Sequence, residues 1–271
     1  MSRRILPGFK FSLGFTIAYL ALLLLLPMAA CLYKASALSG AQFLGAVWTP
    51  RTQAAYRFTL EVSLWSASAG VVLGLLVAWV LVRYEFPLKR VFDSLIDLPF
   101  ALPTAVAGLV YSSLYVKQGW LGQFLVPIGI EGAYSKFAVV LVLTFLGLPF
   151  VVRAIQPVLE TIDADTEEAA FLLGASRLQT FARVIFPAIL PATVTGFALS
   201  FARSLGEYGS VVFVSGNMPF KTEIAPVLIV SRLEEFAYAE ATAIAVVLLG
   251  LSLAMLLVIN QLERWSTSRA T

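Results

Sequence analysis

Long apolar stretches recur along this 271-residue chain and restrict its possible folds more than any other feature. Crossing the ~30 Å hydrocarbon core of a bilayer takes about 20 apolar residues in a helix. A soluble domain could not bury a chain that is 59% hydrophobic and only 13% charged. The sequence therefore predicts an all-α, polytopic membrane protein with six transmembrane helices. The six stretches are approximately Leu13–Tyr33, Thr59–Val82, Leu95–Val116, Phe137–Ile155, Ala188–Phe213 and Thr242–Gln261.

The composition excludes several functions. The chain contains no histidine, which removes the commonest general base and the commonest metal ligand. Its one cysteine, Cys31, cannot form a disulfide within the chain or a thiolate metal cluster. The net charge of +3 includes no large basic block, so we expect no nucleic-acid partner. We accordingly expect no metal site and no catalytic residue.

The distribution of Lys and Arg predicts the orientation. With six helices both termini lie on one side, and the segments on that side hold eleven Lys and Arg against seven on the other. Positive charge collects on the cytoplasmic side, so both termini are predicted to be cytoplasmic. We divide the chain into an N-terminal segment with the first helix and its outer loop (1–55), a transmembrane domain (56–262) and a short cytoplasmic tail (263–271).

One substantial segment, Thr161–Phe186, is polar like a soluble protein. Asp165 precedes Glu168 at the spacing of a capping box, which predicts a helix that begins near Thr166. Gly174 can adopt the left-handed conformation that ends this helix. Ser176 and Gln179 repeat the capping-box spacing and predict a second short helix, which we expect Pro187 to close. The segment is thus a predicted helical hairpin on the cytoplasmic surface.

The hairpin also carries a spaced motif. The motif reads Glu168-Ala169-Ala170, then three residues, Gly174, nine residues and Val184-Ile185-Phe186-Pro187. It follows the pattern EAA, three residues, Gly, nine residues, an aliphatic residue, any residue, Leu, Pro, except that Phe186 stands where the pattern has leucine. This resembles the EAA loop of bacterial ABC importer permeases, here about residues 160–187. The resemblance implies that Glu168, Ala169, Ala170, Gly174 and Pro187 couple the chain to a separate ATPase. The alternative is an ordinary cytoplasmic hairpin that docks to nothing.

No GxxxxGK[ST] motif is present, so the chain cannot hold ATP phosphates by that route. We expect ATP and Mg²⁺ to be bound by partner subunits and not by this chain. The chain itself is predicted to be a transport subunit and not an enzyme.

The resemblance extends over nearly the whole chain. It is carried by Asp97–Gly108, Pro149–Arg153, Ser204–Gly209 and Lys221–Glu223, and by the N-terminal Arg3–Phe9. Together these segments resemble the sulfate/thiosulfate permeases, most closely their T-type subunits. This implies a type I ABC importer permease fold in the inner membrane and translocation of sulfate or thiosulfate. The implied partners are a homologous W-type permease, two ATPase subunits and a periplasmic sulfate- or thiosulfate-binding protein.

Four residues within the apolar stretches are candidates for the translocation pathway. Pro99 and Pro103 lie one turn apart and each removes a backbone donor, which favours either a pathway wall or a kink that serves only packing. Arg203 and Glu207 lie one turn apart where charge is expensive unless it is paired or solvated. A guanidinium there could attract a tetrahedral dianion, or the two could form an ion pair that only fixes helix packing.

The sequence leaves three alternative functions to weigh against a sulfate permease. Molybdate or tungstate permeases share similarity around the Leu-Pro and Leu-Gly-Glu segments, so a molybdate-type permease is an alternative. A self-sufficient secondary anion transporter would need more ionisable residues within the membrane than the Arg203–Glu207 pair. An intramembrane enzyme is disfavoured because HExxH and GxSxG are both absent.

Overall fold

The computed structural model describes the backbone of residues 8–270 and the side chains of residues 8–163 and 165–261. Every regular element in this range is helical, which confirms the all-α prediction. The elements are α1 (Phe9–Leu20), the π-helical turn η1 (Ala21–Leu25), α2 (Leu26–Ser36), α3 (Gly40–Val47), α4 (Pro50–Arg83), α5 (Lys89–Ile96), α6 (Leu98–Ala101), α7 (Thr104–Tyr115), α8 (Gly122–Leu125), the 3₁₀ turn η2 (Val126–Ile128), α9 (Lys136–Thr161), α10 (Ala164–Leu172), α11 (Arg177–Thr180), the π-helical turn η3 (Phe181–Ile185), α12 (Phe186–Leu205), α13 (Val211–Val214), α14 (Ala225–Glu234) and α15 (Tyr238–Ala270).

Within the described residues, five helices are long and apolar enough to cross a membrane. They are Phe9–Ser36, Pro50–Arg83, Lys136–Thr161, Arg177–Leu205 and Tyr238–Gln261. Each overlaps one of the predicted stretches, but the predicted number of six is not reached. The fifth predicted stretch also ends earlier than expected, because the helix stops at Leu205 and α13 is a separate short helix.

The missing helix is the third predicted stretch, which is broken into α5, α6 and α7. Leu102 is extended, with φ −82° and ψ 130°, because a residue that precedes proline is driven out of the helical region. Pro103 then precedes the first residue of α7 and cannot donate a backbone hydrogen bond. The hydropathy of Leu95–Val116 suits a membrane, yet its prolines prevent one continuous helix.

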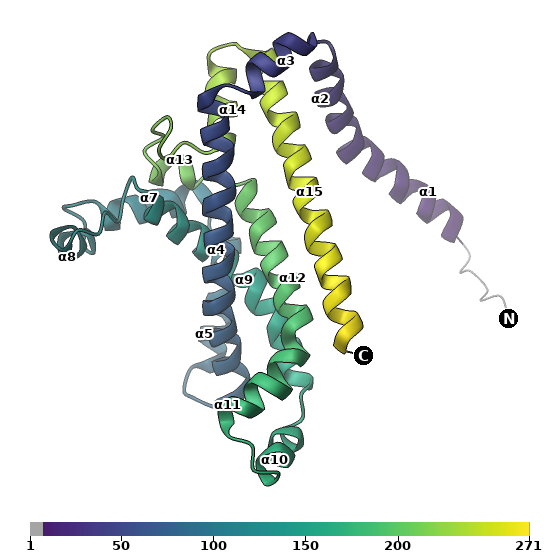
Figure 1. The fold of residues 1–271 in the computed structure, drawn as a ribbon, viewed down its shortest axis with the longest axis vertical. Helices are drawn as coiled ribbons and strands as arrows, with labels where there is room; N and C mark the ends of the chain where they lie inside the picture. The colour runs from purple at the N-terminus through teal and green to yellow at the C-terminus, as the bar shows by residue number, and fades with distance from the viewer. Residues whose placement is uncertain (1–7, 271) are drawn as a thin grey trace.

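Helices α4, α9 and α12 pack together as the centre of the molecule (Figure 1). Small residues permit this close approach: a Cβ added at Gly196 of α12 would lie 2.9 Å from the Cα of Val151 in α9. Such small-residue contacts are typical of helices that associate in a membrane, where dispersion contacts replace the hydrophobic effect. The three helices thus form a close-packed frame for the segments at either end.

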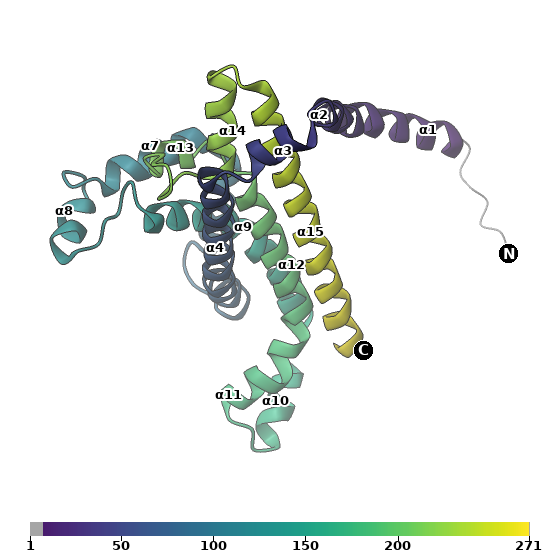
Figure 2. The same cartoon turned by 45° about the horizontal axis from the view of Figure 1, so that its top comes forward.

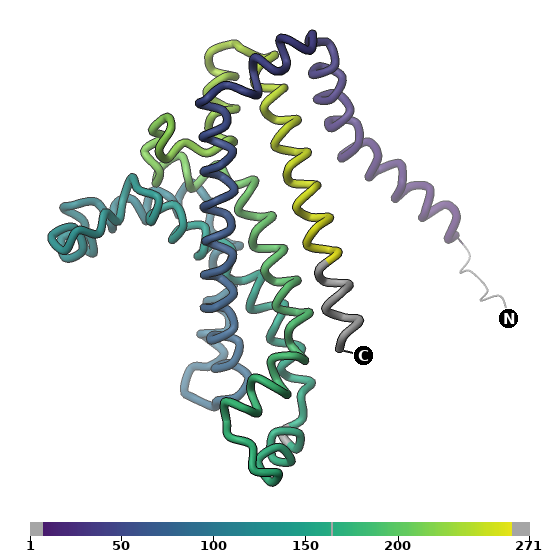
Figure 3. Tube along the Cα trace, viewed as in Figure 1, coloured from purple at the N-terminus to yellow at the C-terminus, as the bar shows by residue number. Residues whose placement is uncertain are grey.

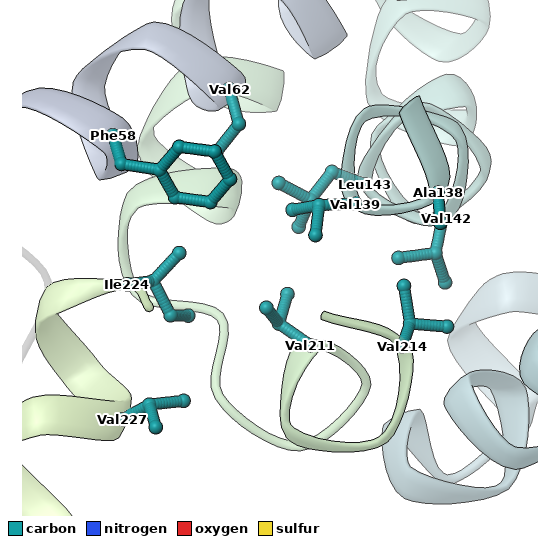
Figure 4. Packing of buried hydrophobic residues seen from close by; sticks show 10 residues of the cluster. All are labelled: Phe58, Val62, Ala138, Val139, Val142, Leu143, Val211, Val214, Ile224 and Val227. Atoms are coloured by element: carbon teal, nitrogen blue, oxygen red, sulfur yellow. The ribbon is translucent and has the colours of Figure 1, made fainter. Parts of the chain in front are cut away.

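Apolar clusters fill both ends of this frame. Toward the start of α4, Phe58 and Val62 meet α9 and the residues Val211 and Val214 of α13 (Figure 4). A second cluster near the end of α4 includes Leu81, Val151 and Ile189. Burial of these side chains fixes α13 and the loops beside it against the central helices.

Helices α10 and α11 project from one end of the bundle, whereas α3 and α14 lie at the other (Figures 1 and 2). The first apolar helix, Phe9–Ser36, leaves the bundle beside α15, and none of its spanning window is buried within this chain. Its apolar side chains are therefore available to lipid or to another subunit.

A close contact between α7 and α13 yields a first test. A Cβ added at Gly108 would lie 2.3 Å from the backbone oxygen of Ser210, and backbone cannot rotate away as a side chain can. We expect Gly108→Ala to destabilise the protein by about 1–3 kcal/mol through overpacking. The measurement is thermal unfolding of the detergent-solubilised protein. Gly250→Ala in α15 is the matched control, because no atom lies within 4 Å of its added Cβ. Equal unfolding of the two variants would contradict the contact.

Candidate functional site

The predicted cytoplasmic hairpin is present as α10 and α11. Gly174 has φ +85°, so its left-handed conformation ends α10 as predicted. The predicted start was wrong: Asp163 and not Asp165 is the N-cap, and it makes no side-chain capping bond. Asp165 and Glu167 instead lie within the first turn, where carboxylates interact favourably with the positive end of the helix dipole.

The second half of the hairpin begins as predicted but does not end there. Ser176 Oγ accepts from the backbone N–H of Gln179 at 3.3 Å, and Gln179 Oε1 accepts from that of Ser176 at 2.8 Å. Pro187 does not close the helix, because α11, η3 and α12 follow one another without a break (Figure 3). The wider π-helical turn ends two residues before Pro187, and its changed hydrogen-bond register accommodates the missing donor of Pro187 within the continuous helix. The hairpin is therefore joined directly to a long apolar helix, Arg177–Leu205.

The hairpin exposes an unusually apolar tip. The side chains that we define as the hairpin tip are 72–89% exposed: Phe171, Leu172, Leu173 and Leu178. Glu168 and Ala169 are exposed beside this tip, Ala170 is half-buried and Pro187 is exposed. No hydrogen bond or ion pair within the described residues uses the carboxylate of Glu168. Apolar side chains gathered beside an unpaired carboxylate on an exposed hairpin are typical of an interaction surface.

Sequence reasoning missed the residue that holds the hairpin to the bundle. Arg83, the last residue of α4, pairs with Glu167 of α10 at 2.6 Å and lies 5.8 Å from the ring centroid of Trp79. Its guanidinium also donates two 3.4 Å hydrogen bonds to the carbonyl oxygen of Ile162. Trp79, Arg83 and Glu167 border a pocket of about 640 Å³ between the hairpin and α4. Both Glu167 and Glu168 line this pocket, but only Glu167 is paired with Arg83.

Arg203 and Glu207 form the ion pair that their spacing suggested. Glu207 is only 3% exposed, and its Oε1 accepts from the backbone N–H and the hydroxyl of Ser210 at 2.8 and 3.0 Å. The hydroxyl of Ser204, beside Arg203, lies 3.0 Å from that of Ser66, near the middle of the 34-residue α4. The pair therefore lies deep in the bundle, with Glu207 fully bonded and the Arg203 side chain 32% exposed.

Of the two proline candidates, Pro103 adjoins a residue that packs against this segment, and Pro99 lies four positions earlier. Pro99 is buried in α6 and Pro103 is exposed before α7. Thr104, which follows Pro103, packs so tightly against the loop after Glu207 that a Cβ at Gly209 would lie 2.3 Å from its hydroxyl oxygen. The structure thus brings the proline break and the segment that contains the ion pair side by side, although they are about 100 residues apart.

A second ion-pair network was also missed. Arg153 of α9 pairs with Asp93 of α5 and with Asp97, at 2.7 Å in each case. The contact with Asp97 is bidentate, because Nε also donates to Oδ1 at 3.0 Å. Each of Asp97 and Arg153 belongs to a segment that carries the family resemblance, yet nothing in the sequence indicates that they pair. The network fastens the broken third stretch to α9.

Comparisons of the sequence with known proteins find a transport family and named permeases among its relatives. The family model described as "Binding-protein-dependent transport system inner membrane component" matches residues 70–271. A sulfate transport system permease protein CysT from Synechocystis is 50% identical over 92% of this chain and 87% of its own length. Its counterpart in Salmonella typhimurium is 47% identical over 97% of this chain and 95% of its own length.

A solved structure shares the fold. A bacterial ABC transporter involved in the import of the acidic polysaccharide alginate contains a chain that aligns with a TM-score of 0.76 over 94% of both chains, at 17% identity. In a second structure, that transporter in complex with an alginate pentasaccharide-bound periplasmic protein, the chain aligns with a TM-score of 0.75 at 19% identity over 94% of this chain and 93% of its own. At these identities the likeness concerns the fold alone.

Proposed function

The chain belongs to the family of binding-protein-dependent transport system inner membrane components, and we propose that it is the permease subunit of an ATP-driven sulfate importer. The observation that carries the sulfate assignment is the 47–50% identity, over nearly the whole chain, to proteins named sulfate transport permeases. Thiosulfate, as a similar tetrahedral dianion, is included in the proposed substrate class.

The proposed complex pairs this chain with a homologous W-type permease, two ATPase subunits and a periplasmic anion-binding protein. ATP and Mg²⁺ would bind to the ATPase subunits. The hairpin tip, together with Glu168, Ala169, Ala170 and Gly174, is the surface that we assign to the ATPase. We accordingly propose that the hairpin and both termini lie in the cytoplasm and that α3 and α14 lie at the periplasmic end.

In the proposed mechanism, ATP draws the ATPase subunits together and moves the hairpin that is seated on them. Two connections carry this movement into the bundle: the continuous helix that leads past Pro187 into α12, and the Arg83–Glu167 pair that leads into α4. Rotation of these helices would open the pathway alternately to each side. We propose that Arg203, Glu207, Pro99 and Pro103 border the pathway, because charge and broken backbone at membrane depth favour a polar lining.

The decisive experiment is uptake of radiolabelled anions by proteoliposomes that contain the complete complex. We expect import of sulfate and thiosulfate that requires both ATP and the binding protein. Import of molybdate in preference to sulfate would support the molybdate-type alternative. Anion uptake by this chain alone, driven by an ion gradient without the ATPase subunits, would contradict the proposal and identify a secondary transporter.

A further inference from the structure

A basic pocket lies at the end of the molecule opposite the hairpin. It has a volume of about 660 Å³ and is formed by the start of α4, the start of α9 and the loop that precedes α14. Arg57, one of its lining residues, is 26 positions before Arg83 on the same helix. The pocket therefore lies about 40 Å along α4 from Arg83, which holds the hairpin to the bundle. We call it the outer pocket, and its polar lining residues are Gln53, Arg57, Glu61, Lys136 and Lys221.

The charges of the outer pocket suit a small dianion. Glu61 is paired with Lys136, which neutralises both side chains. The side chains of Arg57 and Lys221 are exposed, and neither forms a hydrogen bond or ion pair with any residue that the structure describes. The lining thus carries three cations and one carboxylate, a net charge of +2. Two unpaired cations in one concave site attract an anion, and a charge of −2 balances them.

Lys221 is presented by a loop whose backbone is firmly held. The carbonyl oxygen of Met218 accepts from the backbone N–H groups of Lys221, Thr222 and Glu223 at 3.0–3.1 Å. Glu223, which is 3% exposed, is clamped by two hydrogen bonds from Arg51, at 2.6 and 2.9 Å. The loop therefore fixes the position of Lys221 without using its ammonium group.

The same loop contains unfavourable backbone conformations. Phe220, immediately before Lys221, has φ +63°, and Asn217 has φ +50°. A left-handed conformation is costly for a bulky residue such as phenylalanine, and it persists only where surrounding contacts impose it. Strain of this kind is found at ligand sites, and here both Phe220 and the adjacent Lys221 line the same pocket as Arg57.

We propose that the outer pocket is an anion-receiving site that binds the tetrahedral dianion at the periplasmic mouth of the permease. This inference rests on the proposed function, because it takes the transported substrate to be such a dianion. Arg57 and Lys221 supply the charge and the hydrogen-bond donors, while the Glu61–Lys136 pair limits the net charge so that binding stays weak and release is rapid. The site would hold the anion between the binding protein and the intramembrane pathway.

The test is saturable binding of radiolabelled inorganic sulfate to the detergent-solubilised complex without its binding protein, at low ionic strength. Arg57→Gln and Lys221→Gln should each weaken sulfate binding about tenfold, the usual effect of losing one charged hydrogen-bond donor. Lys221→Arg should retain binding because it keeps the charge. Lys117→Gln is the matched control: it removes an exposed cation that does not line the pocket and should have no effect.

Results that differ from the expected loss of sulfate binding would overturn the inference, and each result identifies which part is wrong. Unchanged sulfate binding in both Gln variants would show that the outer pocket is not an anion site. If these variants instead lose only co-sedimentation with the periplasmic binding protein, the pocket is a docking surface for acidic side chains of that protein. A wild-type complex that imports sulfate but shows no pocket-dependent binding would refute this site alone. Failure to import sulfate at all would refute the proposed function.

Discussion

Replacement of Leu172 by aspartate is expected to abolish ATP-driven sulfate uptake while the isolated chain remains as stable as the wild type. Leu172 is 85% exposed, so its loss removes almost no contact within this chain, and the free energy of unfolding should change by no more than about 0.5 kcal/mol. In the complex we expect the same side chain to be buried against the ATPase. A carboxylate placed in that apolar interface should weaken ATPase association by about 30-fold or more.

The measurements are co-purification of the ATPase subunits and uptake by proteoliposomes. Thr166→Asp is the matched control, because it adds the same charge to an exposed position in the first turn of α10, where the helix dipole favours an anion. We expect this control to retain ATPase binding. Full ATPase binding by Leu172→Asp would exclude the hairpin tip from the interface and would move the coupling function elsewhere.

Features that depend on neighbouring residues could be predicted from the sequence. The left-handed Gly174 and the Ser176–Gln179 capping box are set by groups within a few positions of each other, and both are present. Five of the apolar stretches became long helices that overlap the expected positions, because about 20 mostly apolar residues in a row favour a membrane-spanning helix. The stretch Leu95–Val116 failed, because hydropathy ignores the extended backbone that Pro103 imposes on Leu102.

At Pro187 the prediction failed in the other direction: a helix end was predicted, and the helix is continuous. Proline normally ends a helix, yet a π-helical turn that ends two residues before Pro187 supplies the room for its ring, and the helix continues. Ion pairs between distant segments could not be predicted either. Arg153 bonds to Asp97 and Asp93 at separations of 56 and 60 residues, and only the packing of α5 and α9 determines that they meet. The pairing of Arg83 with Glu167 was missed for the same reason, because only the folded chain brings these distant residues together.

Arg203→Ala is expected to destabilise the protein by about 3–5 kcal/mol, because it removes the countercharge of a buried carboxylate. Glu207 is 3% exposed, and without Arg203 its Oε2 atom would lose its ionic partner deep in the bundle. Thermal unfolding of the solubilised protein measures the effect. Arg203→Lys should recover much of the stability, since it restores a cation within reach. An unfolding temperature of Arg203→Ala equal to that of the wild type would show that Glu207 does not depend on Arg203 for its stability in the bundle.

The double variant Arg203→Met/Glu207→Gln separates packing from transport. It removes both charges together, and the amide oxygen that replaces the carboxylate can still accept hydrogen bonds from Ser210, so stability should return to within about 1 kcal/mol of the wild type. The guanidinium of Arg203 is one-third exposed and uses only part of its donor edge on Glu207, which leaves charge available to an anion in the pathway. We therefore expect the stable double variant to import sulfate about tenfold more slowly than the wild type, since one charge-assisted contact is lost. Uptake at the wild-type rate would assign the pair to helix packing alone, because a residue that attracts the anion cannot be removed without affecting its passage.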